Sequence, residues 1–457
     1  MLKNITLRDY QEQILNELRY VPSIGLFIKT GGGKTITSLA RVEQNGTPNL
    51  LVVCPQKIIT QWWEVLEKYT DFTICKYGMS VNSKRKNEII SEFIQNEFIK
   101  KKCVVINFEI LHKIECLKDF VNSTCTMIVD ESHKIKNMGT TRKPVIATKT
   151  CLELGEKTPY KIILTATPTE KENGGYIDLY SQLRFLGYID YSLNYFKSKF
   201  CIEQKMQLPG MPFPIPKVIG YRVAEVNREL KPILNATCRY YAPKYGDYDP
   251  QMIEVNIPKT KNYNKLLRDR VYEEIIFDNV SAMRIGKKSL IGGKITGTNE
   301  YGDRFTYDDN DEKASWLEEF LSNTDDVVSV LYCYNVEKDK IIEVCEKLKK
   351  KYIIINGDVV DKPKELKKEF DVVIGQYQAF SESLDGLQYK CNLMVFYSMP
   401  DSSLLYKQSL GRIDRIGQTK VPTYYHLIME GTIDETIYDM LKNKVEFSEK
   451  ELNEISI

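Results

Sequence analysis

Several features that mark other classes of protein are missing from this sequence of 457 residues. Its 11 cysteines are scattered with no Cys-x-x-Cys pair, and it has only 3 histidines. A zinc site needs clustered ligands, so we expect no zinc. The N-terminus lacks an apolar stretch of signal-peptide length, and no apolar run approaches the length of a membrane span. We therefore expect a protein of the cytoplasm or, in a eukaryote, of the nucleus, with reduced, mostly buried thiols and no membrane partner.

A strong charge of either sign is also missing, because the formal net charge is only +2. This balance gives no indication of a nucleic-acid partner, although a basic groove can coexist with acidic surfaces. Apolar residues make up 42% of the chain and charged residues 28%, which is typical of a globular protein. The length predicts about three domain-sized units.

A glycine-rich turn near the N-terminus predicts a phosphate-binding loop. The apolar run 25–28 predicts a short buried strand. Gly31, Gly32 and Gly33 predict a turn after it, and a helix is predicted from Lys34. Such a turn points backbone N–H groups at an anion. Lys34 suits the β- and γ-phosphates, and the Thr35 hydroxyl suits Mg²⁺. Ile28 replaces the first glycine of the full pattern, and the alternative is a flexible turn that happens to precede a lysine.

Short apolar runs separated by helical segments predict an α/β fold with two parallel-sheet lobes. The predicted strands are 50–54, 72–76, 103–106, 126–129 and 161–164 in the first lobe, and 327–331, 352–355, 372–374 and 393–397 in the second. Between the lobes this alternation stops, a proline-rich stretch covers 208–217, and 261–277 is the clearest helix. We therefore predict an N-terminal lobe over 1–190, a mainly helical or irregular insertion or hinge over 191–320, and a C-terminal lobe over 321–457.

Polar residues follow two of the predicted strands, where active groups of parallel sheets usually lie. Asp130 and Glu131 end one strand, and Thr165, Ala166 and Thr167 follow another. Asp130 is suited to hold Mg²⁺ beside the phosphates, and Glu131 to orient an attacking water. The alternative for the acidic pair is a solvated turn. Gln11 offers both a donor and an acceptor for the edge of an adenine, but its alternative is an exposed glutamine on a surface helix.

A helix is predicted over 402–416, with Asp401 or Ser402 as its N-cap and Gly417 as its stop. Gln408, Arg412 and Arg415 would then share one face, with the two arginines one turn apart. Paired arginines suit a triphosphate held by the other lobe, and the alternative is a basic surface stripe.

Together these segments resemble the helicase-like ATPases of superfamily 2, and within them the Swi/Snf type, from about residue 5 to 440. The segments that carry the resemblance are LRDYQ (7–11), TGGGKT (30–35), CPQKIITQW (54–62), INFEIL (106–111), DESHKIKN (130–137), LTATP (164–168), QSLGRIDRIGQTK (408–420) and EGTIDETI (430–437). The chain departs from the family at 381–388, which lacks a glycine pair, and at 397–400, where an Asp-Trp-Asn-Pro element is replaced.

The resemblance implies two RecA-like lobes that use ATP and Mg²⁺, and it assigns roles to individual residues. The implied catalytic residues are Lys34, Asp130, Glu131, Gln408, Arg412 and Arg415. The implied nucleotide contacts are Gln11, Gly31, Gly32, Gly33, Lys34, Thr35, Asp385 and Gly386, with Thr35 and Asp130 at the metal. His133, Thr165, Ala166 and Thr167 would couple the nucleotide to nucleic acid, which Pro55, Gln56, Lys57, Asn107, Phe108 and Ser381 would contact.

The activity expected from this resemblance is that of a minimal bacterial or phage-type motor. We expect a monomeric, DNA-stimulated ATPase that translocates on double-stranded DNA without sequence preference. One alternative is a strand-separating helicase acting on DNA or RNA. A second is a non-catalytic scaffold that binds nucleic acid and keeps ATP as a structural ligand. The sequence leaves open the pathway and whether a partner protein loads or activates the motor.

Overall fold

The computed structural model describes residues 2–139, 144–169, 175–207, 213–242, 244, 246, 248–359, 362–381 and 384–453. The chain divides into two compact units. Unit 1 comprises Met1–Pro243 with Glu446–Ile457, and unit 2 comprises Lys244–Val445. Among the residues described, no helix combines the length and the apolar character needed to cross a membrane.

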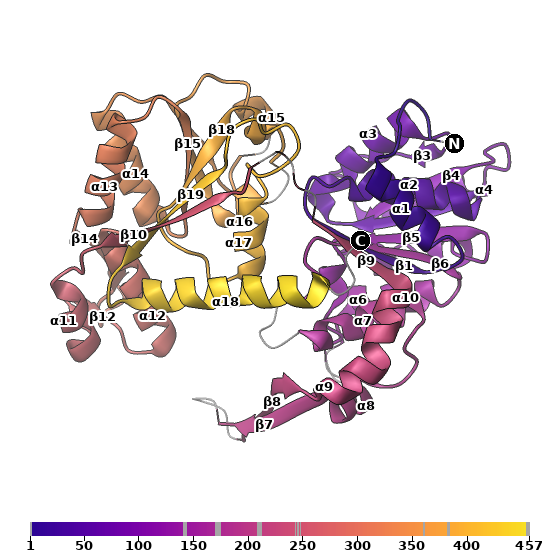
Figure 1. Cartoon of the computed structure of the whole chain (residues 1–457), viewed down its shortest axis with the longest axis horizontal. Helices are drawn as coiled ribbons and strands as arrows, with labels where there is room; N and C mark the ends of the chain where they lie inside the picture. Colours follow the sequence, from indigo (N-terminus) through magenta and orange to yellow (C-terminus); the bar gives the residue numbers. More distant parts are fainter. Residues whose placement is uncertain are drawn as a thin grey trace. The chain divides into compact units, whose positions relative to one another are not determined.

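Unit 1 is built on a parallel sheet of seven strands, in the order β3-β4-β2-β5-β6-β1-β9 (Figure 1). The strands are β1 (Ile24–Ile28), β2 (Asn49–Cys54), β3 (Thr73–Cys75), β4 (Lys102–Asn107), β5 (Cys125–Asp130), β6 (Tyr160–Leu164) and β9 (Cys238–Tyr241). The helices are α1 (Asp9–Glu17), α2 (Lys34–Asn45), α3 (Ile59–Tyr69), α4 (Ser83–Gln95), α5 (Leu117–Phe120), α6 (Ile146–Gly155), α7 (Tyr176–Leu186), α8 (Leu193–Phe200), α9 (Val223–Glu225) and α10 (Lys231–Thr237). An antiparallel pair, β7 (Cys201–Met206) and β8 (Ile215–Tyr221), completes the unit.

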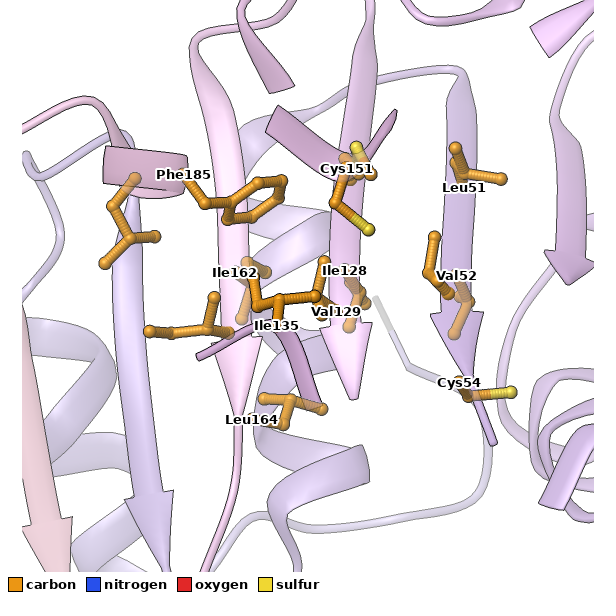
Figure 2. Close-up of a cluster of buried hydrophobic side chains, with 14 of the residues drawn as sticks. Leu51, Val52, Cys54, Ile128, Val129, Ile135, Cys151, Ile162, Leu164 and Phe185 are labelled. Atoms are coloured by element: carbon orange, nitrogen blue, oxygen red, sulfur yellow. The ribbon is translucent and has the colours of Figure 1, made fainter. Parts of the chain in front are cut away.

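The central strands of this sheet are apolar along their length because both faces are covered. Every residue of β1 and of β5 is buried. Figure 2 shows the packing, with side chains of β2, β5 and β6 together with Ile135, Cys151 and Phe185 from helical segments. This core fixes the ends of β1, β5 and β6, where the predicted site residues begin.

Unit 2 contains a parallel sheet of six strands, in the order β10-β19-β18-β15-β17-β16. The strands are β10 (Gln251–Ile257), β15 (Val327–Tyr332), β16 (Tyr352–Ile355), β17 (Val372–Gln376), β18 (Cys391–Phe396) and β19 (Thr423–Met429). The helices are α11 (Asn262–Asp269), α12 (Val280–Ile291), α13 (Glu312–Ser322), α14 (Asn335–Lys347), α15 (Lys362–Glu365), α16 (Tyr377–Ser381), α17 (Ser403–Leu410) and α18 (Ile433–Asn453). The residues of α18 from Glu446 onward belong to unit 1. Two short antiparallel pairs are β11 (Val271–Tyr272) with β12 (Ile275–Ile276), and β13 (Lys294–Thr298) with β14 (Arg304–Asp308). The predicted fold class, two parallel-sheet lobes with flanking helices, is confirmed.

The segment 191–320 differs from the expected insertion, because it is divided between the two units and contains more strand. It supplies the edge strand β9, which pairs with β1, and the edge strand β10, which pairs with β19. β10 alternates more and less exposed residues, the pattern of a strand with one covered face. The helix expected over 261–277 ends at Asp269, because Arg270 adopts a positive φ of 56° and a hairpin follows. Residues 208–212 of the proline-rich stretch lie outside the described residues.

A buried histidine in unit 2 predicts a pH-dependent stability. His426 on β19 is fully buried, its Nε2 lies 2.8 Å from the hydroxyl of Tyr406, and its ring stacks on Phe396. Burial lowers the pKa of His426 from 6.5 to about 4, partly opposed by the charge of Glu254. The unfolded chain therefore takes up a proton between pH 6.5 and 4 that the folded chain does not, so stability is complete above this window and falls as the pH decreases.

We expect the wild type to lose about 2 kcal/mol more unfolding free energy between pH 7 and pH 5 than a His426→Gln variant loses. Urea unfolding of both proteins at the two pH values measures this difference, and groups that titrate in both proteins cancel from it. An identical pH dependence in the two proteins would show that His426 ionises normally in the folded state.

Candidate nucleotide-binding site

The predicted phosphate loop has the expected strand, turn and helix. β1 ends at Ile28 and α2 begins at Lys34. Gly31 and Gly33 have positive φ values of 84° and 79°, which L side chains rarely adopt. A Cβ atom on Gly33 would also lie 2.7 Å from Nε2 of Gln11. Glycine is therefore required at this turn, and the N-terminal N–H groups of α2 are those that would bind an anion.

Side chains of α1 support this loop from the protein interior. Gln11 is buried, and its Nε2 donates to the carbonyl of Gly33 at 3.3 Å and to Oγ1 of Thr37 at 2.9 Å. The hydroxyl of Tyr10 donates to the carbonyl of Gly32. The interpretation of Gln11 as an exposed surface glutamine is therefore wrong, because its amide contacts the loop. Tyr10 is a contact that our sequence reasoning missed, although it stands beside Gln11.

Asp130 is held rigidly at the end of β5. Its Oδ2 accepts a hydrogen bond from Nε1 of Trp62 at 2.9 Å, and its Oδ1 accepts one from the backbone N–H of Glu131 at 2.9 Å. Burial and the neighbouring charge of Glu131 raise the pKa of Asp130 to about 6, whereas the positive charge of Lys34 opposes this rise. Nζ of Lys34 donates to the carbonyl of Ile28 at 3.1 Å. A further cation near Asp130 would stabilise the charged form of this buried carboxylate.

These residues fit Mg²⁺ bound together with a nucleotide. Asp130 supplies a carboxylate, and Thr35, in the first turn of α2, supplies a hydroxyl. In the described ranges no group of three or more His, Cys, Asp or Glu side chains could hold a metal alone. Mg²⁺ usually binds one or two carboxylates and takes its other ligands from water and substrate phosphates. The donor set therefore suits a metal that arrives with phosphate.

A series of polar contacts connects Glu131 to the segment after β6. Nδ1 of His133 lies 3.3 Å from Oε2 of Glu131 and 3.2 Å from Oγ1 of Thr165. The backbone N–H of Thr167 donates to the same Oγ1 at 3.0 Å. Glu131 has a positive φ of 54°, a conformation that non-glycine residues adopt only where the surroundings impose it. The predicted coupling residues are therefore brought together in unit 1, with Ala166 between the two threonines.

A second set of hydrogen bonds, which the sequence did not predict, also connects the acidic motif to the segment after β6. Oγ of Ser132 donates to Oε1 of Gln182 at 2.7 Å, and Nε2 of Gln182 donates to the carbonyl of Pro168 at 2.9 Å. Both side chains are fully buried. Ser132 lies within the acidic motif, but Gln182 on α7 carries no local pattern that distinguishes it. In the same segment, the hydroxyl of Thr167 is buried and has no hydrogen-bond partner among the described residues.

The predicted nucleic-acid contacts of unit 1 differ in exposure. Gln56 and Lys57 are exposed and Pro55 is half-buried, at the start of the turn that leads into α3. Asn107 and Phe108 are buried, and Nδ2 of Asn107 donates to Glu109 at 2.6 Å. The side chains that unit 1 presents outward among these predicted contacts are therefore those of Gln56 and Lys57.

In unit 2 the helix predicted over 402–416 is shorter than expected. Oγ of Ser402 caps it by accepting from the N–H of Leu405, as predicted, but α17 ends at Leu410. Gly411 is its C-cap, so Arg412 and Arg415 lie in the turns that follow and do not share a helix face with Gln408, which is half-buried on α17. Gly417 does not stop the helix, and its φ of 94° marks a later turn.

The two arginines of unit 2 that are predicted to contact the triphosphate, Arg412 and Arg415, have different partners. The guanidinium of Arg412 is buried and donates to the carbonyls of Leu384, at 2.9 Å, and of Ser381. Nη1 of Arg415 lies 3.3 Å from Oδ1 of Asp385. Arg412 therefore connects the segment after α17 to the end of α16 and the residues that follow it. Arg415 is paired with a carboxylate that is largely exposed.

The remaining predicted residues of unit 2 lie near these arginines. The hydroxyl of Ser381 is buried 2.8 Å from that of Ser409, so this side chain faces α17. Gly386 has a φ of 96°, and its N–H donates to Oδ1 of Asp385 at 2.9 Å. Residues 382 and 383, which belong to the run that departs from the family pattern, lie outside the described residues.

Comparison with known proteins identifies the domain that contains the candidate site. Residues 22–238 match the SNF2-related domain, and this stretch contains the phosphate loop, Asp130, Glu131 and the segment after β6. Unit 1 of the chain therefore carries an SNF2-related domain. This SNF2-related chain is 22% identical to the RNA polymerase-associated protein RapA of Actinobacillus pleuropneumoniae, over 90% of the chain and 47% of RapA. It is also 22% identical to the DNA repair and recombination protein RAD54 of Saccharomyces cerevisiae, over 87% of the chain and 48% of RAD54.

The SNF2-related chain thus spans about half the length of these two relatives. Its fold is similar to the crystal structure of the Hef helicase domain of Pyrococcus furiosus, with a TM-score of 0.54 and 14% identity over 95% of this chain and 98% of that one. At this identity the likeness supports the two-lobed parallel-sheet fold alone.

Proposed function

We propose that this SNF2-related chain is a DNA-stimulated ATPase that translocates on double-stranded DNA. The observation that carries the proposal is the arrangement in unit 1, where Lys34 at the start of α2 acts electrostatically on the buried carboxylate of Asp130, and Glu131 follows directly. A lysine, a helix N-terminus and two carboxylates are the groups that phosphoryl transfer to water requires.

In the proposed reaction the backbone N–H groups of the loop and the Lys34 ammonium hold the β- and γ-phosphates. Glu131 orients a water whose oxygen bonds to the γ-phosphorus as the bond to the bridging β–γ oxygen breaks. Inorganic phosphate and ADP are the products. Mg²⁺, held by Thr35 and Asp130 with the phosphates, would neutralise the charge that develops on the phosphate oxygens. Arg415 and Arg412 of unit 2 would stabilise the same charge, with Gln408, Asp385 and Gly386 as further nucleotide contacts.

The polar contacts from Glu131 through His133 to Thr165 and Thr167 support a link between hydrolysis and nucleic acid. The distances along this chain are short enough that a shift of the segment after β6 alters the surroundings of Glu131. The relatives RAD54 and RapA are named for DNA repair and for association with RNA polymerase, which favours DNA as the polymer. Contacts through Gln56 and Lys57 to backbone phosphates would position the motor without reading sequence.

Steady-state ATP hydrolysis with no polymer, duplex DNA, single-stranded DNA or RNA tests this proposal. We expect the strongest stimulation from duplex DNA, and a decline of that stimulation with rising salt because phosphate contacts release counterions. Stimulation by single strands or RNA alone would favour a strand-separating helicase. Nucleotide binding without hydrolysis under any condition would favour the scaffold alternative.

A further inference from the structure

Trp62 contacts the candidate metal ligand from α3, the helix that directly follows the exposed predicted DNA contacts. Its Nε1 donates to Oδ2 of Asp130 at 2.9 Å, and both side chains are buried. Oδ1 of Asp130 is held separately by the N–H of Glu131, so each carboxylate oxygen has one protein donor. Two donors on different oxygens fix the plane of the carboxylate and leave each oxygen a further lone pair for a metal ion or its water.

The same helix begins next to the proposed DNA contacts. Gln56 and Lys57 lie in the short helical turn Gln56–Ile58, which continues directly into α3 at Ile59. Trp62 is on the first turn of α3, whose apolar face is buried through Ile59, Trp62, Trp63 and Leu66. A displacement of the exposed turn therefore moves the indole that holds Asp130, because a packed helix shifts as one body.

We propose that Trp62 is a positioning residue that orients Asp130 for Mg²⁺ and transmits DNA contact at Gln56 and Lys57 to the nucleotide site. The proposal rests on the proposed function, because it requires a nucleotide and Mg²⁺ at the phosphate loop. It adds a direct path from α3 to the metal ligand, in addition to the chain through His133 and Thr165.

The alternative is that Trp62 is a core residue whose N–H merely needs a buried acceptor. The adjacent Trp63 supplies a matched control. It lies on the same helix, is 9% exposed and packs edge-on against Tyr77, and its Nε1 is buried without a hydrogen-bond partner. Trp62→Phe removes the donor to Asp130, whereas Trp63→Phe makes the same chemical change without removing a hydrogen bond.

The test measures the binding of a fluorophore-labelled ADP by anisotropy in the full chain and in each variant. Titrations in EDTA, in Mg²⁺, and in Mg²⁺ with duplex DNA give two ratios, the gain in nucleotide affinity from Mg²⁺ and the change in affinity from DNA. We expect Trp62→Phe to decrease the magnesium gain by about tenfold or more, the usual effect of losing a residue that orients a metal ligand. We expect the ratio of nucleotide affinities with and without DNA to approach one in this variant. The Trp63→Phe variant should keep both ratios of the wild type.

Each outcome of this test has a defined meaning. An unchanged magnesium gain in Trp62→Phe would overturn the positioning role, and an unchanged DNA effect would overturn the transmission. Absence of magnesium-dependent nucleotide binding in the wild type would instead overturn the proposed function itself, so the two failures are distinguishable.

A spectroscopic measurement keeps the proposal falsifiable if Trp62→Phe does not fold. The chain has 3 tryptophans, so the double variant Trp63→Phe, Trp316→Phe leaves Trp62 as the sole indole. We expect its emission to change when Mg²⁺ and ADP are added, and to change further with duplex DNA. Emission that is unaffected by both additions would contradict the proposal.

Discussion

Replacement of Lys34 by alanine is expected to lower the kcat of ATP hydrolysis by about a thousandfold or more. The substitution removes the ammonium that would bind the β- and γ-phosphates, and it removes the positive charge that lowers the pKa of Asp130. The loop itself should keep its shape, because the positive φ values of Gly31 and Gly33 and the contacts of Gln11 and Tyr10 do not involve this side chain.

Phosphate release at saturating duplex DNA measures this effect, and thermal unfolding of the variant checks that unit 1 remains folded. Lys34→Arg is the matched control, since it keeps the charge but not the compact ammonium, and we expect it to recover binding more than turnover. Hydrolysis at wild-type rate in Lys34→Ala would mean that the nucleotide site lies elsewhere in the chain.

Replacement of Arg415 by alanine is expected to lower kcat by about a thousandfold while nucleotide affinity stays within a few-fold of the wild type. An arginine that stabilises charge only in the transition state contributes little to ground-state binding. The Asp385 carboxylate that pairs with Arg415 is largely exposed, so water can solvate it once the arginine is removed and the loss of stability should be small. The variant should therefore remain folded, and single-turnover hydrolysis beside equilibrium binding of labelled ADP separates the two effects.

Arg412→Ala gives a useful contrast in the same experiment. The guanidinium of Arg412 donates to the carbonyls of Leu384 and Ser381, so its loss should lower the stability of unit 2 as well as turnover. Asp385→Asn is the control for Arg415, because it weakens the pair and leaves the arginine in place. A normal kcat in Arg415→Ala would exclude this residue as an arginine finger.

The features that the sequence predicted well are those that local chemistry determines. The turn at Gly31–Gly33 needs positive φ values, and the fully buried strands β1 and β5 need continuous apolar runs, so both are visible in a short window. Asp130 and Glu131 follow such a run directly. The position of these residues at the same edge of the sheet followed from the parallel arrangement of its strands alone.

The features that the sequence did not predict depend on tertiary contacts. β10 was missed because an edge strand has only one covered face and its apolar pattern is weak. The end of α17 was misplaced because Arg412 is bound by carbonyls that are about 30 residues away in sequence, and this binding competes with a longer helix. Trp62 and Gln182 have no local sequence pattern that distinguishes them from ordinary core and helix residues. Only the folded structure shows their hydrogen bonds to Asp130 and Pro168.

Displacement of a third DNA strand from a triplex on linear duplex DNA tests directly whether the protein translocates. We predict that the wild type displaces the strand when ATP and Mg²⁺ are present, and that it fails with a non-hydrolysable analogue or with the Lys34→Ala variant. ATP hydrolysis that duplex DNA stimulates without any strand displacement would contradict a translocating motor. Displacement that persists in Lys34→Ala would contradict the assignment of the nucleotide site to the phosphate loop.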